Sequence, residues 1–585
     1  MRHFNAKAIS CLTLWVLLIT SIFAQIPGGY EKGFSTINKK RMYADIAFFA
    51  SDSMKGRPTG SRENLSAARY IAEKFRLLGL KPLLTSDRKT TAKKGTEIEE
   101  GAETPEIESP SESDLYLQKF NLKKTRLTEN SSLSIIENIP GGKVQRSYKS
   151  KIDFLLHYHL PEGIDITSPV VFLGYGIDYG ENGYSDYMDE AGNKIDVRNK
   201  IVLIVDGFPQ DRNPESVFSK SKNVLYRNPL RKAELAASKG ALAVLIMNSV
   251  TKTEPPVPVK YAKSIPNFQR INFSLPGITR EDIPIFYVSN TIVKALFKGT
   301  GKKVEDLVEM NNTDLKSRSF EFKEKAIGMD IDVEQELLNT QNVVAFLEGT
   351  DPKLKDEIVV IGAHYDHIGL GYYGASDIQD IGKIHPGADD NASGTAGLIA
   401  LAEAFSKTPP KRSIVFMAFT GEENGIQGSR YYVNNQPLKP IDKTIAMLNL
   451  DMISRNNEDE LMIGGAFYSA EIIKVLERAN QNIKLNLFYN TGIYSTASDQ
   501  AHFIRKKIPS LFFFGGFHED YHRITDVIEK ININKAETVT KLAYLTGWIL
   551  GNENTKPSFK EANHEERMEI VRESMERRKI LEQNK

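Results

Sequence analysis

Nearly continuous apolar segments, separated by helix-like stretches, constrain the fold of residues 340–553. A strand with few polar residues must be covered on both faces, which is typical of the interior of a sheet that carries helices on each side. This pattern predicts an α/β fold, a mixed-sheet α/β/α sandwich, with the chemistry at the ends of the strands. The expected strands are 342–347, 357–363, 413–419, 444–450 and 509–514.

The remaining regions differ from this pattern. Residues 36–80 are expected to form two helices around the Gly-Arg-Pro-Thr-Gly break at 56–60. Residues 85–114 contain basic residues, then eight acidic residues and almost no apolar ones, which predicts a solvated, flexible insertion. Residues 556–585 are rich in charge and carry methionines at helical spacing, so we expect a charged helical tail.

Residues 165–300 are predicted to form a separate, smaller domain. Short apolar runs recur there between Gly- and Pro-rich turns, together with one helix, which indicates a β-rich or small α/β unit. The segment contains no obvious catalytic cluster.

Residues 1–24 have the layout of a secretory signal peptide. A short basic start precedes an apolar run at 8–23, and Ala24 supplies a small residue before a cleavage point. We therefore expect export to the periplasm or the medium. The alternative is an uncleaved membrane anchor, although the run is short for a spanning helix.

Charge and cysteine content exclude several classes of function. Lys+Arg 76 against Asp+Glu 75 gives a net charge of +1, which argues against a nucleic-acid partner. Cys11 is the single cysteine, so the chain has no disulfide framework, no cysteine-ligated zinc and no iron–sulfur cluster.

Histidine and acidic residues gather at the ends of the expected strands. Six of the ten histidines lie between positions 364 and 522. A charge at the end of an apolar strand is costly unless it is paired, although each motif alone could equally be structural. The motifs are GAHYDH (362–367), GADDNASG (387–394), TGEEN (420–424), LNLDM (448–452) and HEDYHRITD (518–526).

Together the motifs supply two imidazoles and three carboxylates. Such ligands without a thiolate suit zinc, and cobalt or manganese also accept them. Three carboxylates exceed what one structural zinc usually takes, so a carboxylate that bridges two ions about 3.5–4 Å apart fits the count better. The side chains are His364, Asp390, Glu423, Asp451 and His522.

In this order the motifs resemble those of metallopeptidase family 28, the co-catalytic zinc aminopeptidases related to bacterial leucyl aminopeptidase, aminopeptidase Y and glutamate carboxypeptidase. The resemblance covers residues 340–530. The segment GRPTGSRENLSAARYIAEKF (56–75) resembles the family's N-terminal part, which assigns residues 25–120 to the same domain. Residues 165–300 resemble the protease-associated (PA) domain that some members carry as an insertion.

The resemblance implies two Zn²⁺ ions per chain and a role for each matching residue. His364 would bind one ion and His522 the other. Asp390 would bridge the ions, with Glu423 beside one ion and Asp451 beside the other. Glu422 resembles the general base, and Asp366 the carboxylate behind His364. Four nearby residues receive only a structural or substrate-proximal role: His367, His385, Asp389 and His518.

One position departs from the family pattern. Related sequences often have Ser-Asp-His before the last strand, whereas this chain has Ser498-Asp499-Gln500. None of these residues is among the implied ligands, so the departure concerns local packing or the substrate pocket. Tyr494, just upstream, is either an oxyanion donor or a packed loop tyrosine.

The resemblance implies a zinc exopeptidase that acts on peptides, with an aminopeptidase as the leading function. A glutamate carboxypeptidase would need a basic pocket for the substrate carboxylate, and no arginine cluster stands out near the motifs. A glutaminyl cyclase would use one zinc, which disagrees with the Glu422–Glu423 pair and His364. A non-catalytic, receptor-like binding module would have lost ligands, and none is lost. The sequence leaves the oligomeric state open.

Overall fold

The computed structural model describes residues 26–82, 111–158, 163–179, 183–211, 213, 215–218, 229–248, 272–276, 283–435, 437–489 and 496–583. The predicted signal peptide, Tyr494 and residues 85–110 of the predicted insertion lie outside this part. The chain divides into two units. Unit 1 comprises residues 1–120, 340–370 and 383–585, and unit 2 comprises residues 121–339 and 371–382.

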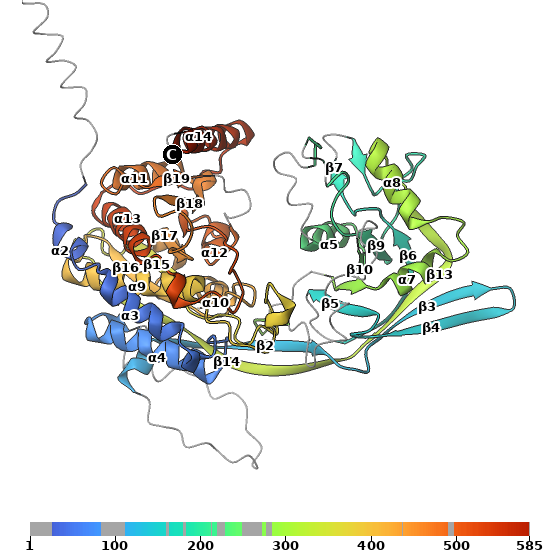
Figure 1. The fold of residues 1–585 in the computed structure, drawn as a ribbon, viewed down its shortest axis with the longest axis horizontal. Helices are drawn as coiled ribbons and strands as arrows, with labels where there is room; N and C mark the ends of the chain where they lie inside the picture. Colours follow the sequence, from blue (N-terminus) through green and yellow to red (C-terminus); the bar gives the residue numbers. More distant parts are fainter. Residues whose placement is uncertain are drawn as a thin grey trace, which may run out of the picture. The chain divides into compact units, whose positions relative to one another are not determined.

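Most strands of one mixed sheet lie at the centre of unit 1 (Figure 1). The strand order is β11-β2-β14-β16-β15-β17-β20-β18-β19, and β1 pairs with β14. β16, β15, β17 and β20 pair with one another in parallel. β14 runs antiparallel to β16, and β18 runs antiparallel to β20 but parallel to β19. The bounds are β1 Lys81–Pro82, β2 Leu117–Leu127, β11 Asn272–Ser274, β14 Val333–Leu347, β15 Ile358–His364, β16 Ser413–Phe419, β17 Thr444–Asp451, β18 Glu460–Gly464, β19 Asn486–Phe488 and β20 Ser510–Phe514.

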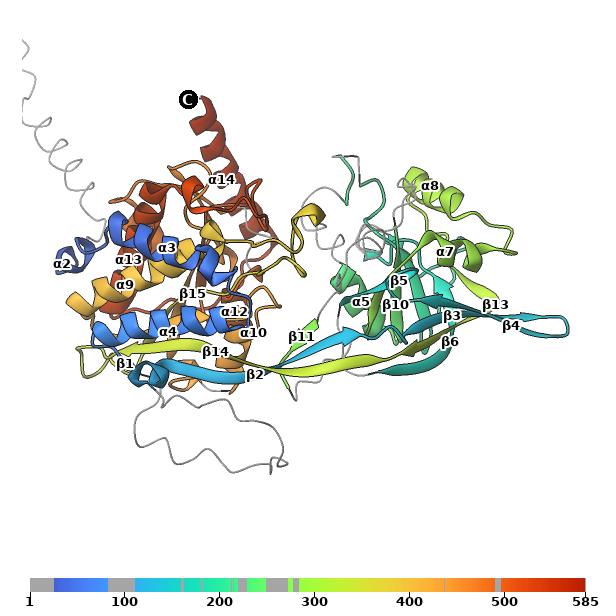
Figure 2. The same cartoon turned by 60° about the horizontal axis from the view of Figure 1, so that its bottom comes forward.

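Helices cover both faces of this sheet, as the apolar strands predict. Five helices, α3, α4, α9, α11 and α13, bury side chains against one face, and α10 and α12 do so against the other. Figure 2 shows α3, α4 and α9 side by side. The bounds are α2 Glu31–Phe34, α3 Lys39–Phe49, α4 Arg62–Leu77, α9 Gly394–Lys407, α10 Gln427–Asn435, α11 Ala470–Asn480, α12 Gln500–Arg505, α13 Ile533–Asn552 and α14 His564–Gln583.

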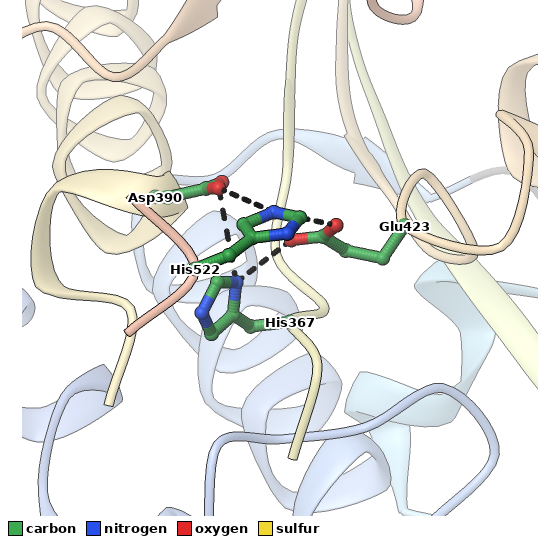
Figure 3. A group of neighbouring side chains, drawn as sticks. All are labelled: His367, Asp390, Glu423 and His522. Carbon is green, nitrogen blue, oxygen red and sulfur yellow. Dashed lines mark hydrogen bonds and ion pairs between the residues drawn. The ribbon is translucent and has the colours of Figure 1, made fainter. Parts of the chain in front are cut away.

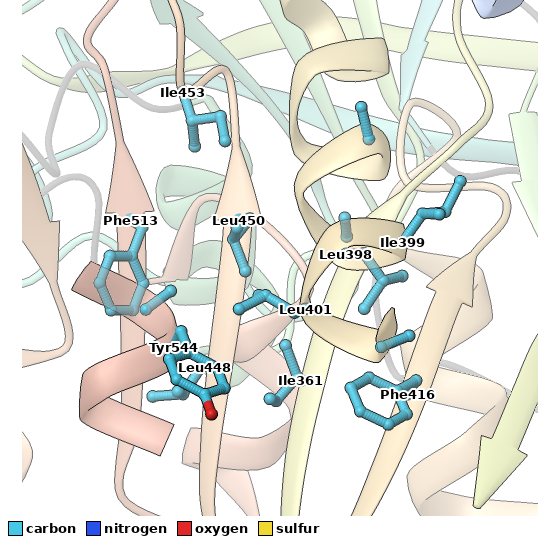
Figure 4. Close-up of a cluster of buried hydrophobic side chains, with 14 of the residues drawn as sticks. Ile361, Leu398, Ile399, Leu401, Phe416, Leu448, Leu450, Ile453, Phe513 and Tyr544 are labelled. Atoms are coloured by element: carbon cyan, nitrogen blue, oxygen red, sulfur yellow. The ribbon is translucent and has the colours of Figure 1, made fainter. Parts of the chain in front are cut away.

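Alternate residues of each central strand enter different cores. In β15, Val359 and Ile361 face the larger cluster, and Val360 faces the smaller one. Figure 4 shows the larger cluster, where strand residues such as Leu448 pack beneath α9 and against Tyr544 of α13. Burying a side chain of this size contributes about 1.5–3 kcal/mol, which fixes the register of the strands.

The two N-terminal helices form where the sequence predicts them. Asn38 caps α3 by accepting hydrogen bonds from the amides of Lys40 and Arg41. Ser61 caps α4 through the amide of Asn64, and the helix ends before Gly79, whose φ of 73° suits glycine. The tight segment 56–60 therefore sits between two well-capped helices.

Unit 2 contains an eight-stranded sheet in the order β4-β3-β13-β6-β9-β10-β12-β5. Its centre, β6 to β12, is parallel, and the short apolar runs predicted between 165 and 300 form these strands. The unit also includes residues on either side of that range, because β3, β4 and β13 have mixed polarity and give no apolar run. The bounds are β3 Ser132–Ile139, β4 Gly142–Lys149, β5 Phe154–Tyr158, β6 Ile164–Phe172, β7 Asp178–Tyr179, β8 Tyr184–Ser185, β9 Ile201–Val205, α5 Pro229–Ser238, β10 Ala243–Met247, β12 Ile285–Val288, α7 Asn290–Phe297, α8 Val304–Asp314 and β13 Phe320–Ile331.

None of the described helices combines the length and the apolar character that crossing a lipid bilayer requires. The similarity of residues 165–300 to a PA domain stays a prediction.

Candidate metal centre

The histidine and acidic motifs converge at one edge of the unit 1 sheet. β15, β16 and β17 are neighbouring parallel strands, so their carboxyl ends lie at the same edge. β15 ends at His364, β17 ends at Asp451, and Glu422 and Glu423 follow β16 after a two-residue turn. Asp390 precedes α9, and His522 follows β20.

The first group of potential metal ligands comprises His364, Asp390 and Asp451. Nε2 of His364 lies 3.3 Å from Oδ1 of Asp390 and 3.2 Å from Oδ1 of Asp451. All three residues are buried. One imidazole and two carboxylates thus face a common point.

The second group comprises His367, Asp390, Glu423 and His522 (Figure 3). Nε2 of His522 lies 3.1 Å from Oδ2 of Asp390 and 3.0 Å from Oε2 of Glu423. Nδ1 of His367 lies 2.7 Å from Oε1 of Glu423 and 4.0 Å from Oδ2 of Asp390. The figure shows the four side chains pointing toward one another from separate segments of the chain.

Asp390 belongs to both groups and offers a different oxygen to each. Its Oδ1 faces His364, and its Oδ2 faces His522. Tetrahedral zinc with bonds of about 2.0–2.1 Å separates neighbouring ligand atoms by about 3.3 Å. The separations of 3.0–3.3 Å around Asp390, Asp451 and Glu423 fit that geometry.

The charge distribution also fits metal ions. Among the described residues, no lysine or arginine forms an ion pair with Asp390, Glu423 or Asp451, whose ion-pair partners are histidines. The buried Arg57 faces main-chain carbonyls instead. Burial lowers the pKa of Arg57 to about 10, against the raising effect of Asp390 and Asp526, so it stays protonated at neutral pH. Buried carboxylates without such partners are costly unless cations neutralise them.

The histidines and carboxylates shift one another's pKa values. Burial alone would lower the pKa of His364, but the surrounding carboxylates, Asp451 and Glu422 foremost, together outweigh burial and raise the pKa well above its usual value. His522 behaves similarly beside Glu423. Burial would raise the pKa of Asp390, but His364 and His522 hold it well below its usual value. The ligand atoms therefore form a strongly interacting cluster.

Asp366 lies behind His364, but its closest contact differs from the expected one. Nδ1 of His364 lies 3.2 Å from the main-chain oxygen of Asp366 and 3.7 Å from its carboxylate oxygen Oδ1. That carboxylate accepts hydrogen bonds from the hydroxyl of Thr59 (2.8 Å) and the amide of Glu422 (3.2 Å). Asp366 thus links the loop of His364 to two other segments.

The structure brings together all five side chains that the sequence suggests as ligands, and it adds His367. The sequence predicts only a structural or substrate-proximal role for His367, because a second histidine in GAHYDH has no distinguishing signal. His385 contacts the carbonyl of Lys383, and Nε2 of His518 lies 3.3 Å from Asp389. Neither belongs to the two groups.

The unusual Gln500 has a packing role. Its side-chain oxygen accepts a hydrogen bond from Nδ2 of Asn449, which also donates to Ser498. Asn449 lies two residues before Asp451 on β17. The glutamine that replaces the histidine of Ser-Asp-His therefore contacts the end of β17, so the departure concerns local packing there.

Comparison with known proteins identifies the domain that carries both groups. Residues 342–546 match the model of Peptidase family M28. The chain is 31% identical over 201 residues to a probable leucine aminopeptidase 2 of Aspergillus oryzae, covering 33% of this chain and 36% of that protein. It is 28% identical over 228 residues to leucine aminopeptidase 2 of Trichophyton rubrum, covering 33% and 41%. The chain thus spans less than half the length of these relatives.

An aminopeptidase from Aneurinibacillus sp. strain AM-1 has a similar structure, with a TM-score of 0.52 and 20% identity over 92% of this chain and 98% of that chain. At this identity the likeness concerns the fold, and it confirms the predicted mixed α/β architecture. Residues 342–546 are a peptidase family M28 domain, which is a metallopeptidase domain.

Proposed function

We propose that the protein is a zinc-dependent aminopeptidase that holds two Zn²⁺ ions and removes N-terminal residues from peptides. The observation that carries this proposal is the carboxylate of Asp390, whose two oxygens serve two separate ligand groups. His364 and Asp451 would complete one ion's ligands, and Glu423 and His522 the other's. His367 would add a ligand to the second ion or orient Glu423.

When bound, zinc supplies Lewis acidity, which polarises a peptide carbonyl and acidifies water. The chain's own residues must then position the substrate and move protons. Glu422 is suited to proton transfer because it belongs to neither ligand group, yet it is adjacent to Glu423 and its amide donates to Asp366. In this role it accepts the proton of the attacking water and returns it to the leaving amine.

An apolar wall adjoins the second group and supports an apolar N-terminal residue in the substrate. The ring of Tyr521 stacks on His522 with centroids 3.9 Å apart, and Phe517 packs against Tyr521 at 4.7 Å. Phe517 is 50% exposed, which is high for a phenylalanine. We propose that this surface contacts the first side chain of the peptide, in agreement with the names of the two leucine aminopeptidase relatives.

The alternatives call for other features. A carboxypeptidase needs a cation for the substrate's terminal carboxylate. In the described part of the chain, the buried Arg57 lies beside the groups, but it uses its donors on main-chain carbonyls. A glutaminyl cyclase with one zinc ion would not need a carboxylate that belongs to two ligand groups, as that of Asp390 does. A non-catalytic binding module would not need a glutamate such as Glu422, which lies beside the ligands but belongs to neither group.

A substrate panel tests the proposal. The purified full-length protein, loaded with zinc, is assayed on leucyl, alanyl, glutamyl and lysyl nitroanilides, an N-acetylated leucyl control, a peptide with C-terminal glutamate and one with N-terminal glutamine. We expect hydrolysis of free N-terminal substrates, fastest for leucyl, with loss on chelation and recovery on adding zinc. Release of C-terminal glutamate, cyclisation of glutamine or full activity without metal would contradict it.

We also propose that the protein is exported, because residues 1–24 resemble a signal peptide. Mass spectrometry of the protein from cell fractions tests this. Export predicts a mature N-terminus near residue 25 in the periplasm or medium, and an intact residue 1 in the cell interior argues against it.

A further inference from the structure

Arg57 makes an unusual set of hydrogen bonds beside the metal centre. Its side chain is fully buried. The guanidinium donates to five main-chain carbonyls, with donor–acceptor distances from 2.6 to 3.1 Å. The acceptors are the carbonyls of Phe49, Tyr365, Pro386, Gly387 and Asp390.

Four of these carbonyls belong to the two loops that carry ligands. Tyr365 directly follows His364, while Gly387 and Asp390 belong to the loop before α9. A single planar group with a fixed fork of donors therefore spans the loop of one ligand and the loop of the shared ligand. The fifth acceptor, Phe49, anchors the guanidinium to the end of α3.

The backbone of segment 56–60 lies directly against the loop after β15. The carbonyl of Arg57 accepts from the amide of His367 at 3.4 Å, and that of Gly56 accepts from Gly369 at 3.2 Å. A Cβ on Gly56 would lie 2.4 Å from the carbonyl oxygen of His385, so this close approach requires glycine. The segment is thus fixed relative to both ligand loops.

Thr59 of the same segment contacts a third part of the site, the carboxylate of Asp366. Its hydroxyl donates to Oδ2 of Asp366 at 2.8 Å, while the other oxygen of that carboxylate accepts from the amide of Glu422. The main-chain oxygen of Asp366 contacts His364. Thr59 therefore helps to hold the residue that orients the His364 ring.

We infer that Arg57 and Thr59 are positioning residues of the metal centre: they set the spacing between the His364 and Asp390 loops and the orientation of Asp366. The inference rests on the proposed function and extends it to a segment about 300 residues away from the ligands in the chain. Neither residue contacts the ions in this role. Both act through the main chain and through Asp366, so their loss changes ligand geometry before it changes chemistry.

The chain offers matched controls for both residues. Arg412 is also fully buried and donates to the carbonyls of Leu550, in α13, and Asn554, just beyond it, as well as to the carboxylate of Glu357. Thr546 is a buried threonine whose hydroxyl donates to the carbonyl of Leu542 within α13. Arg412→Lys and Thr546→Val therefore remove comparable hydrogen bonds away from the ligand loops.

The test compares Arg57→Lys and Thr59→Val with these controls in the full-length protein. Zinc affinity is measured by competition with a chromophoric chelator, and ligand geometry by the absorption spectrum of the Co²⁺-substituted protein. Lysine is shorter, has fewer donors and lacks the planar fork. We expect both test variants to fold, to lose about 10–100-fold in zinc affinity and to change the Co²⁺ spectrum. The controls should keep both properties even where they lower Tm.

Wild-type affinity and spectrum in Arg57→Lys would overturn the inference. If that variant does not fold, Thr59→Val decides alone: an unchanged affinity and spectrum overturns the inference, and the expected loss sustains it. The wild-type protein separates the two proposals. Failure of the wild type to bind zinc contradicts the proposed function, whereas wild-type binding with unaffected variants contradicts the positioning roles alone.

Discussion

Glu422 and Glu423 are consecutive in the chain, but their surroundings drive their pKa values in opposite directions. Burial, together with the nearby charges of Glu423 and Asp451, raises the pKa of Glu422 well above its usual value, although His364 opposes this. Burial would raise the pKa of Glu423 too, but His522 and His367 together outweigh burial and lower the pKa to about 2. One glutamate is thus suited to carry a proton and the other to remain an anionic ligand.

Replacing Glu422 should strongly reduce turnover without removing the metal. Glu422→Ala or Glu422→Gln removes the proton acceptor, so we expect kcat to fall about 10²–10⁴-fold, roughly 3–5 kcal/mol of barrier. Zinc content, measured by elemental analysis, should stay at the wild-type value. Wild-type kcat in either variant would remove Glu422 from the mechanism.

The two ligand groups should respond differently to loss of one carboxylate. Asp451 belongs to one group and Asp390 to both, so Asp451→Ala should lose one zinc ion per chain and Asp390→Ala both. Inductively coupled plasma mass spectrometry after gel filtration gives the stoichiometry. Asp356→Ala, which changes an exposed carboxylate, serves as the control. Two retained ions in Asp390→Ala would contradict the shared role.

His367 should contribute to the second group. Its Nδ1 lies 2.7 Å from Glu423, so His367→Gln removes either a ligand or the partner that orients one. We expect the overall zinc affinity of the centre to fall about 10–100-fold, with a smaller loss than in His522→Ala. Isothermal titration with zinc measures both, and His502→Gln, a buried histidine of α12 outside the groups, is the control. An unchanged affinity would leave His367 with a packing role.

Much of this site could be predicted from the sequence, because strand ends in a parallel sheet meet at one edge. Each of His364, Asp390, Glu423, Asp451 and His522 follows or precedes an element that the apolar pattern locates within a few residues. Periodicity and strand position are local signals, so this part of the site needed no long-range information.

Arg57 and Thr59 could not be found in this way. Most of their partners lie about 300 residues away and are main-chain carbonyls. Every residue type has such a carbonyl, so the sequence does not show which residues accept these hydrogen bonds. The limits of unit 2 were obscured for a related reason. The edge strand β4 has mostly exposed side chains, so its sequence resembles a polar loop.

Removal of metal should destabilise unit 1. The groups place several buried carboxylates close together, and zinc that binds the folded state stabilises it by about 2.7 kcal/mol per site at 100-fold excess over Kd. Differential scanning calorimetry with and without chelator should show a Tm lower by several degrees in the metal-free protein, and Asp390→Ala should not respond. An identical Tm in both states of the wild type would argue against resident ions.

Unit 2 should become less stable as pH rises from about 4 to about 7. Burial raises the pKa of Asp186 to about 7 from 3.8, although the amide of Ile177 and the hydroxyl of Tyr184 donate to it. A carboxyl with a raised folded-state pKa favours folding only while it is protonated. The loss is about 1.4 kcal/mol per pH unit at most and ends above pH 7.

Asp186→Asn should remove this dependence. An asparagine oxygen can still accept from the amides of Tyr175 and Ile177, while its nitrogen faces Tyr184. Hydrogen exchange in urea at pH 5.5 and 8, corrected for intrinsic rates, measures the stability of β9 peptides, with β15 peptides as the internal reference. Equal pH dependence in wild type and variant would show that Asp186 is ionised throughout.

The shared carboxylate of Asp390 also couples the binding of one metal ion to the binding of the other. If the centre holds the two ions proposed above, they would not be independent occupants, because both would draw on one carboxylate and the first would neutralise part of the negative charge that attracts the second. A titration of the metal-free protein then reports a joint equilibrium with an interaction constant. Separate "tight" and "loose" constants cannot be assigned to the two halves by deleting a ligand from one of them.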